Sequence, residues 1–174
     1  MGGIRVPNRV RAPALALMAL VVVVAPNLTS TAAPARSRDC LARVAGLNLQ
    51  RATIPQLRRA LASGRLTSEK LVRSYLKRTR AYDPHLNSIR HLNKDALKQA
   101  RRFDRLRKAG KARGPLGGIP ILLKDNVNTT DMPTTAGSIA LKGSVPKHDA
   151  FITKKLEGAG AIILGKLNLS EFAG

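Results

Sequence analysis

Residues 114–126 read GPLGGIPILLKDN, an apolar run between glycine and proline breakers on one side and the triplet Lys124-Asp125-Asn126 on the other. Aliphatic and β-branched residues bounded by such breakers predict a short buried strand. Because burial disfavours the ammonium form, a lysine at the end of this strand can act as a base near neutral pH. The same pattern fits a lysine that merely extends from a strand end to solvent, and spacing alone leaves both interpretations open.

A second apolar run, at residues 161–165, follows a predicted helix at residues 151–158. Two apolar strands separated by a helix indicate a right-handed βαβ crossover in a parallel sheet. Ligands of such sheets bind where the carboxyl ends of the strands emerge, and both Lys124 and Lys166 are predicted at those ends. The glycines near the second strand precede it instead of following it, which excludes a dinucleotide-binding loop.

The residues before the first strand predict helices. A capping-box-like start at residues 53–56 opens one helix, which ends at Gly64. Thr67 or Ser68 caps the next helix, which is expected to end where Pro84 restricts the residue before it.

The intervening segments are less regular. Residues 86–92 are ambiguous and are compatible with a short strand in which Ile89 is buried. Residues 127–138 are rich in threonine and contain Pro133 and Gly137, so they predict a loop. Residues 138–142 are compatible with one helical turn.

The net charge is +21, from 31 lysines and arginines against 10 acidic residues. Such an excess raises the question of a polyanionic partner. The cations concentrate at residues 94–113, but apolar residues recur there at helical spacing, so the cations form the solvated face of a helix that Asp95 caps and that ends near Gly110. Because aromatic residues are only 3% of the chain, stacking platforms for single strands are missing. We therefore expect no specific nucleic-acid partner.

Cysteine and histidine give no sign of a metal site. Cys40 is the only cysteine, so neither an intrachain disulfide nor a cysteine-based metal cluster is expected. His85, His91 and His148 lack metal-ligand spacing, and we expect all three at the surface.

Residues 1–35 have the features of a secretory signal peptide. Arginines precede an apolar stretch at residues 14–25, and the small residues after it fit an A-x-A-like cleavage site. The apolar stretch is shorter than the roughly 20 residues of a membrane-spanning helix. The sequence therefore predicts a secreted protein with residues 36–52 as a linker and no membrane association after cleavage. An uncleaved anchor is the alternative.

Three motifs follow one another along the chain: the strand with its Lys-Asp-Asn triplet, the stretch MPTTAGS at residues 132–138, and the final GAGAIILGKLNLSEFAG. Residues 53–174 resemble the amidase signature family, in which these motifs occur in the same order. The resemblance implies an α/β fold with a mixed sheet between helices, of which this chain holds the N-terminal helices and the first βαβ-like strands. It also implies hydrolysis of a small-molecule amide by two serines and a lysine base, without a metal or an organic cofactor. Lys124 matches the lysine, and Ser138 falls in a segment that lines the site.

The family's Gly/Ser-rich segment, which carries both serines, follows the part that matches KLNLSEFAG and has no counterpart here. We therefore expect residues 53–174 to be the N-terminal part of an amidase domain and the 174-residue chain to be inactive. Ser138, Ser144 and Ser170 fit turns or helix caps better than catalysis, and Asp125 fits a structural role.

Two alternatives to an amidase remain open. One is the catalytic component of a tRNA-dependent amidotransferase, which shares this fold, although an export signal argues against a cytosolic reaction. The other is a noncatalytic basic module that binds anionic polymers.

Overall fold

The computed structural model describes residue 2, residues 41–112 and residues 114–174. Apart from residue 2, the predicted signal peptide lies outside the described residues, as do residues 36–40 of the predicted linker. In the part of the chain that the structure describes, no helix combines the length and apolar character needed to cross a bilayer.

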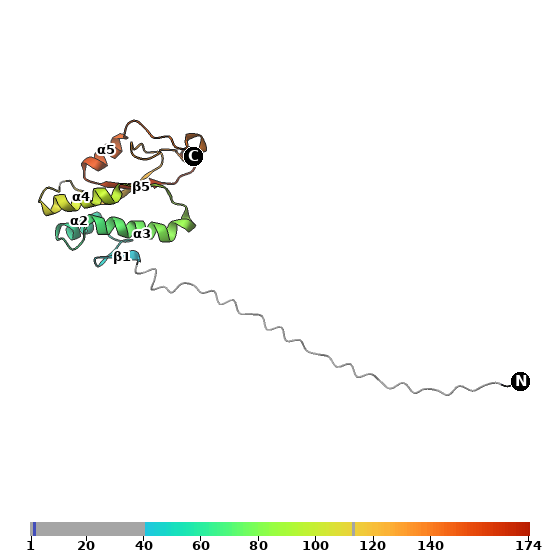
Figure 1. The fold of residues 1–174 in the computed structure, drawn as a ribbon, viewed down its shortest axis with the longest axis horizontal. Coiled ribbons are helices and arrows are strands. Elements are labelled where there is room, and N and C mark those ends of the chain that lie inside the picture. The colour runs from blue at the N-terminus through green and yellow to red at the C-terminus, as the bar shows by residue number, and fades with distance from the viewer. Residues whose placement is uncertain (1, 3–40, 113) are drawn as a thin grey trace. The chain divides into compact units, whose positions relative to one another are not determined.

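The described chain alternates helices and short strands (Figure 1). In chain order, the elements are β1 (Arg43–Val44), β2 (Leu47–Asn48), α2 (Ile54–Ala62), α3 (Ser68–Leu86), β3 (Ile89–Leu92), α4 (Ala96–Lys108), β4 (Pro120–Lys124), η1 (Ile139–Leu141), α5 (Phe151–Gly158), β5 (Ile162–Leu167) and η2 (Glu171–Ala173).

Three strands form a mixed sheet in the order β3-β5-β4. β4 and β5 are parallel, as the strand–helix–strand pattern predicted, while β3 runs antiparallel to β5. β5 is therefore the central strand, and β4, the strand of the GPLGGIPILLKDN stretch, has β5 as its only partner among the described residues.

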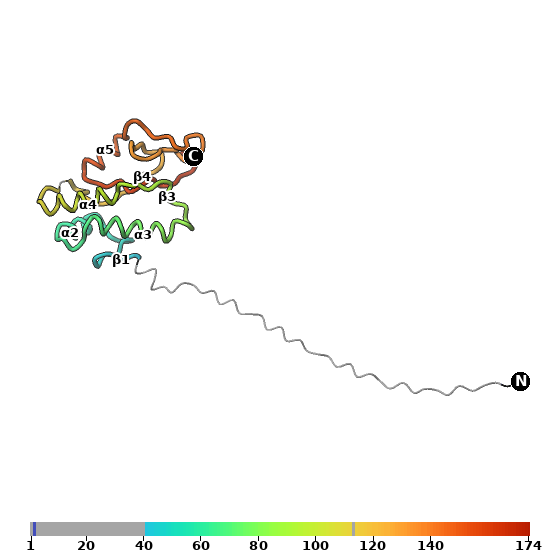
Figure 2. Tube along the Cα trace, viewed as in Figure 1, coloured from blue at the N-terminus to red at the C-terminus, as the bar shows by residue number. Residues whose placement is uncertain are grey.

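The sheet carries apolar side chains on both faces. Ile162 and Leu164 of β5 pack in one cluster with Val72 of α3 and Ala96 and Ala100 of α4. The opposite cluster joins Leu123 and Ile163 to Met132, with Val127 and Leu156 packed against it. Figure 2 shows the corresponding layers, with α3 and α4 on one side of the strands and α5 on the other. The fold is thus a mixed sheet between helices, as the family resemblance implied.

Residues 41–52 are folded, although they fall in the predicted linker. β1 and β2 form an antiparallel hairpin. Val44 and Leu49 are buried together with Leu57 and Leu61 of α2, so this part of the chain contributes to the core.

The start of α2 follows the prediction. Thr53 and Gln56 form the expected capping box, with the Gln56 N–H bound to the Thr53 hydroxyl and the Thr53 N–H bound to the Gln56 side chain.

The predicted end of α3 at Pro84 is wrong, because the helix continues to Leu86. Pro84 lies in the last turn, where its missing N–H removes a single hydrogen bond. The end is instead closed by Asp83, whose carboxylate accepts the N–H groups of Ser88 and Ile89, and by Asn87 in the left-handed conformation.

Asp95 stands at the predicted N-cap of α4, but its side chain makes no capping hydrogen bond. The side-chain oxygen of Asn93 accepts the Asp95 N–H at 2.8 Å instead. The helix itself is amphipathic as predicted, since Ala96 and Ala100 are buried while most of its cations are exposed.

Candidate functional site

Lys124 is the last residue of β4, and its side chain is exposed. It lines an open hollow of about 580 Å³ together with Asn87, Ser88 and residues 167–170, which comprise the last residue of β5 and the three residues after it. No other described residue forms a hydrogen bond or ion pair with its amine. The strand end therefore presents a free amine at a hollow, and the lysine is not partly enclosed in the core.

Asp125, the next residue, points into the protein and is fully buried. One carboxylate oxygen accepts the Thr135 N–H at 3.2 Å and also accepts the Thr135 hydroxyl, while the other has no partner among the described residues. The Asp125 N–H donates to the Leu167 carbonyl at 3.0 Å. This residue thus connects the end of β4 to the loop and to β5, in agreement with the structural role predicted for it.

Ser138 is buried at the start of η1, where its hydroxyl accepts the Ala140 N–H at 3.3 Å. The residues that line the hollow do not include it. The structure therefore places Ser138 as a cap in the loop behind the strand end and does not bring it beside Lys124.

The other serines considered from sequence, both among the residues that the structure describes, form no hydrogen bond with Lys124. Ser144 is exposed, and its carbonyl accepts the Thr134 N–H. Ser170 does line the hollow and precedes η2, but the predicted side-chain cap of that helix is not formed.

Lys166 is the residue whose environment sequence reasoning missed. It lies on β5 opposite Leu123 of β4, and its side chain has 0% exposure. Its ammonium donates to the Val127 carbonyl at 2.7 Å, the Thr134 hydroxyl at 2.8 Å and the Pro133 carbonyl at 3.3 Å. The only sequence signal was a lysine embedded in the apolar run IILGKL.

Two opposing effects act on the Lys166 amine. Burial is the larger, and it lowers the pKa below the ordinary lysine value of 10.5. The carboxylates of Asp125, Asp131 and Asp149 raise the pKa and partly offset this effect. The loop around Lys166 therefore supplies both the hydrogen-bond acceptors and the negative charge that a buried ammonium requires.

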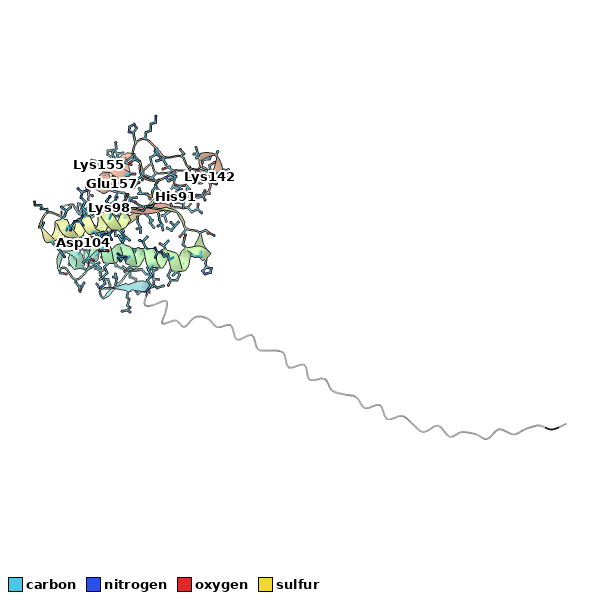
Figure 3. All side chains as sticks on the ribbon, in the orientation of Figure 1. His91, Lys98, Asp104, Lys142, Lys155 and Glu157 are labelled. Carbon is cyan, nitrogen blue, oxygen red and sulfur yellow. The ribbon has the colours of Figure 1, made fainter. Side chains whose placement is uncertain are left out.

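The prediction that His91 lies at the surface is wrong. It is half-buried on β3, opposite Lys166 in the strand register, and its Nε2 is buried without a hydrogen-bond partner among the described residues (Figure 3). His85 and His148 are exposed, as predicted. The described residues contain no group of three or more side chains suited to hold a metal ion.

Comparison with known proteins gives a consistent result. The family model described as Amidase matches residues 70–174. A protein of Schizosaccharomyces pombe named as an amidase is 46% identical over 128 residues, which are 73% of this chain and 22% of that protein. A glutamyl-tRNA(Gln) amidotransferase component of Streptomyces avermitilis is 41% identical over 128 residues, which are 73% of this chain and 26% of that protein.

A solved structure shows the same similarity in three dimensions. The peptide amidase of Stenotrophomonas maltophilia superposes with a TM-score of 0.68 at 46% sequence identity, covering 70% of this chain and 26% of that one. The chain thus spans about a quarter of the length of the relatives it matches.

Proposed function

Since the chain belongs to the amidase family, we propose that it supplies the lysine of an amide-hydrolysing site and that Lys124 is the catalytic base. The observation that carries the proposal is the free amine of Lys124 at the carboxyl end of a parallel strand, above a hollow. Ligands of α/β sheets gather at such strand ends. Asp125, buried next to it, anchors the strand end from which the amine extends.

The proposed chemistry is acyl transfer to a serine followed by hydrolysis. The amine of Lys124 accepts a proton from a bridging serine, which in turn takes the proton of the serine that attacks the amide carbonyl. The lysinium then returns the proton to the departing amine or ammonia, as a general acid. In this proposal both serines belong to polypeptide corresponding to the three quarters of the relatives that the chain does not match. We expect the 174-residue chain alone not to hydrolyse amides.

The proposed substrate is a small-molecule carboxylic amide. The relatives named as an amidase and a peptide amidase support this class. The relative named as part of a glutamyl-tRNA(Gln) amidotransferase supports a second candidate, an amide-processing component that works on charged tRNA. Export by residues 1–35, which we also propose, favours the first candidate because tRNA charging is cytosolic. Secretion of a reporter fused to these residues would support export, and retention of the reporter would favour the second candidate.

The experiment is a chimera in which residues 41–174 replace the matching region of the Stenotrophomonas maltophilia peptide amidase. We expect the chimera to hydrolyse a peptide amide and Lys124→Ala to lower kcat by about a thousandfold, within the range observed for loss of a general base. Lys142→Ala, at an exposed lysine outside the hollow, is the matched control and should keep full activity.

Two results would contradict this assignment. Hydrolysis by the chimera that survives Lys124→Ala would remove Lys124 from the catalytic site. An inactive chimera combined with salt-sensitive binding of the 174-residue chain to a polyanion such as heparin, unchanged by Lys124→Ala, would favour a basic binding module.

A further inference from the structure

The loop at residues 125–136 begins directly after Lys124 and closes on the same strand end. The Val127 N–H donates to the Lys124 carbonyl at 3.0 Å, and the Ala136 N–H donates to the Asp125 carbonyl at 3.0 Å. The outgoing limb, residues 125–128, and the returning limb, residues 133–136, are therefore both attached at the point where β4 ends.

Lys166 is bound to both limbs of this loop. Its ammonium donates to Val127 on the outgoing limb and to Pro133 and Thr134 on the returning limb. A lysine ammonium has three N–H donors, and each of them has an acceptor here. Because β5 is the central strand, held by β3 on one side and β4 on the other, the amine is anchored to the most constrained part of the sheet.

We propose that Lys166 is a positioning residue that fastens both limbs of the 125–136 loop to β5 and thereby fixes the strand end from which Lys124 extends. The proposal rests on the role of Lys124 proposed above. Lys166 does not line the hollow, and its three donors are already used. It therefore acts through the backbone of Lys124 and Asp125 and has no contact with a substrate.

The attachment of the loop to Lys166 depends on the ammonium group and not on the length of the side chain. Lys166→Met keeps an unbranched apolar side chain but leaves two carbonyls and one hydroxyl without their donor. In the 174-residue chain we expect this variant to raise amide hydrogen exchange in residues 125–136 by about tenfold or more, because the loop opens locally without unfolding of the helices. Exchange in α2 should stay within about twofold of the original chain, and Lys154→Met, at an exposed lysine, should change neither segment.

Chemical rescue separates the charge from the packing. Lys166→Cys is made together with Cys40→Ser and alkylated in the unfolded state. With 2-bromoethylamine the thiolate displaces bromide and gives a lysine-like ammonium, whereas 2-bromoethanol gives a neutral side chain of similar length. The ammonium form should restore the slow exchange of residues 125–136, and the neutral form should not. Equal protection by both forms, or unchanged exchange in Lys166→Met, would overturn the proposal.

Thr134→Val provides a second test should the Lys166 variants not fold. It removes one acceptor of Lys166 together with the bond from the Thr134 hydroxyl to the Val127 carbonyl at 3.5 Å, and it leaves Lys166 in place. Exchange on the returning limb should therefore rise by about threefold or more, with the core unaffected. Unchanged exchange in this variant would contradict the proposal that Lys166 fastens the loop to β5.

The chimera tests the consequence for catalysis. Lys166→Met should lower kcat by about tenfold or more with KM within about twofold, because the base is displaced while substrate contacts are kept. A change in KM alone, or no change at all, would overturn the positioning role. An inactive unmutated chimera would instead refute the role of Lys124, while the exchange measurements would still decide whether Lys166 fastens the loop.

Discussion

Lys124 and Lys166 occupy the ends of two adjacent parallel strands and have opposite environments. Lys124 is exposed above a hollow without a partner among the described residues, whereas Lys166 is fully buried and donates three hydrogen bonds. The two residues share their type, the direction of their strands and the end of the sheet at which they lie, so none of these explains the difference in exposure. What differs is the sheet face. The register pairs Lys166 with Leu123 and Lys124 with Leu167, so the two side chains leave opposite faces of the sheet. The 125–136 loop covers the face from which Lys166 extends.

The comparison separates two uses of the same functional group. A free amine at a hollow can exchange protons with a reacting partner. A buried amine with three acceptors and nearby carboxylates instead holds a loop in place, because removing it leaves buried polar groups without partners. The two lysines should therefore respond differently to the same substitution.

The largest expected effect tests this contrast through stability. Lys166→Met should lower the free energy of unfolding of the 174-residue chain by about 3 kcal/mol, because buried carbonyls and the Asp125 carboxylate lose the ammonium. Lys124→Met, at the exposed position, should change it by less than about 0.5 kcal/mol. Urea denaturation followed by circular dichroism measures both, with the slope m as a check that unfolding exposes the same surface.

Equal losses of unfolding free energy in the two variants would contradict the contrast between the two lysines. They would mean that the Lys124 side chain also contributes to packing, or that the Lys166 tie contributes nothing beyond ordinary surface contacts.

Much of the fold could be read from the sequence, because the signals are local. The capping box at Thr53, the apolar runs of β4 and β5 and the helix between them all follow from periodicity and breakers. The position of Lys124 at a strand end follows from the same breakers. These features depend on residues within a few positions of one another.

What could not be predicted depends on contacts between distant segments. The burial of Lys166 is set by a loop more than thirty residues earlier, which has no periodicity. At the start of α3, Thr67 forms the predicted cap by accepting the Lys70 N–H. The further bonds there were not predicted, because they come from Asp104 of α4, which accepts the N–H groups of Ser68 at 2.7 Å and Glu69 at 2.9 Å. Composition carries no information about such pairings.

A smaller effect tests whether Asp125 and Lys166 belong to one unit. Thr135→Val removes the hydroxyl that donates to the Asp125 carboxylate and keeps the backbone N–H bond. We expect a loss of about 1–2 kcal/mol, because a buried carboxylate is left with one donor fewer. Thr130→Val, at an exposed threonine, is the matched control for thermal or urea unfolding.

A double substitution sharpens the result. If the carboxylate and the ammonium are coupled, Thr135→Val combined with Lys166→Met should cost less than the sum of the two single changes. Strict additivity of the two losses in unfolding free energy would show that the Thr135–Asp125 bond and Lys166 hold the loop independently.

The smallest effect concerns Asp131 and Asp149, whose carboxylates act both on Lys166 and on Glu157 of α5. Glu157, the penultimate residue of α5 (Figure 3), has its pKa raised above 4.5 by partial burial and by the carboxylates of Asp149 and Asp131. The folded chain therefore binds more protons than the unfolded chain between pH 4.5 and the raised pKa. The contribution of Glu157 to stability is present below pH 4.5 and is lost as the pH rises through the raised pKa.

Glu157→Gln should consequently stabilise the chain by about 0.5 kcal/mol at pH 7 and by less at pH 4, where the carboxyl is protonated in both states. Urea unfolding of the two chains at several pH values measures the difference, and Glu171→Gln, at an exposed residue of η2, is the control. Asp131 and Asp149 repel Glu157 and at the same time favour the ammonium of Lys166. A gain that did not depend on pH would mean that neither burial nor the carboxylates of Asp149 and Asp131 raise the pKa of Glu157.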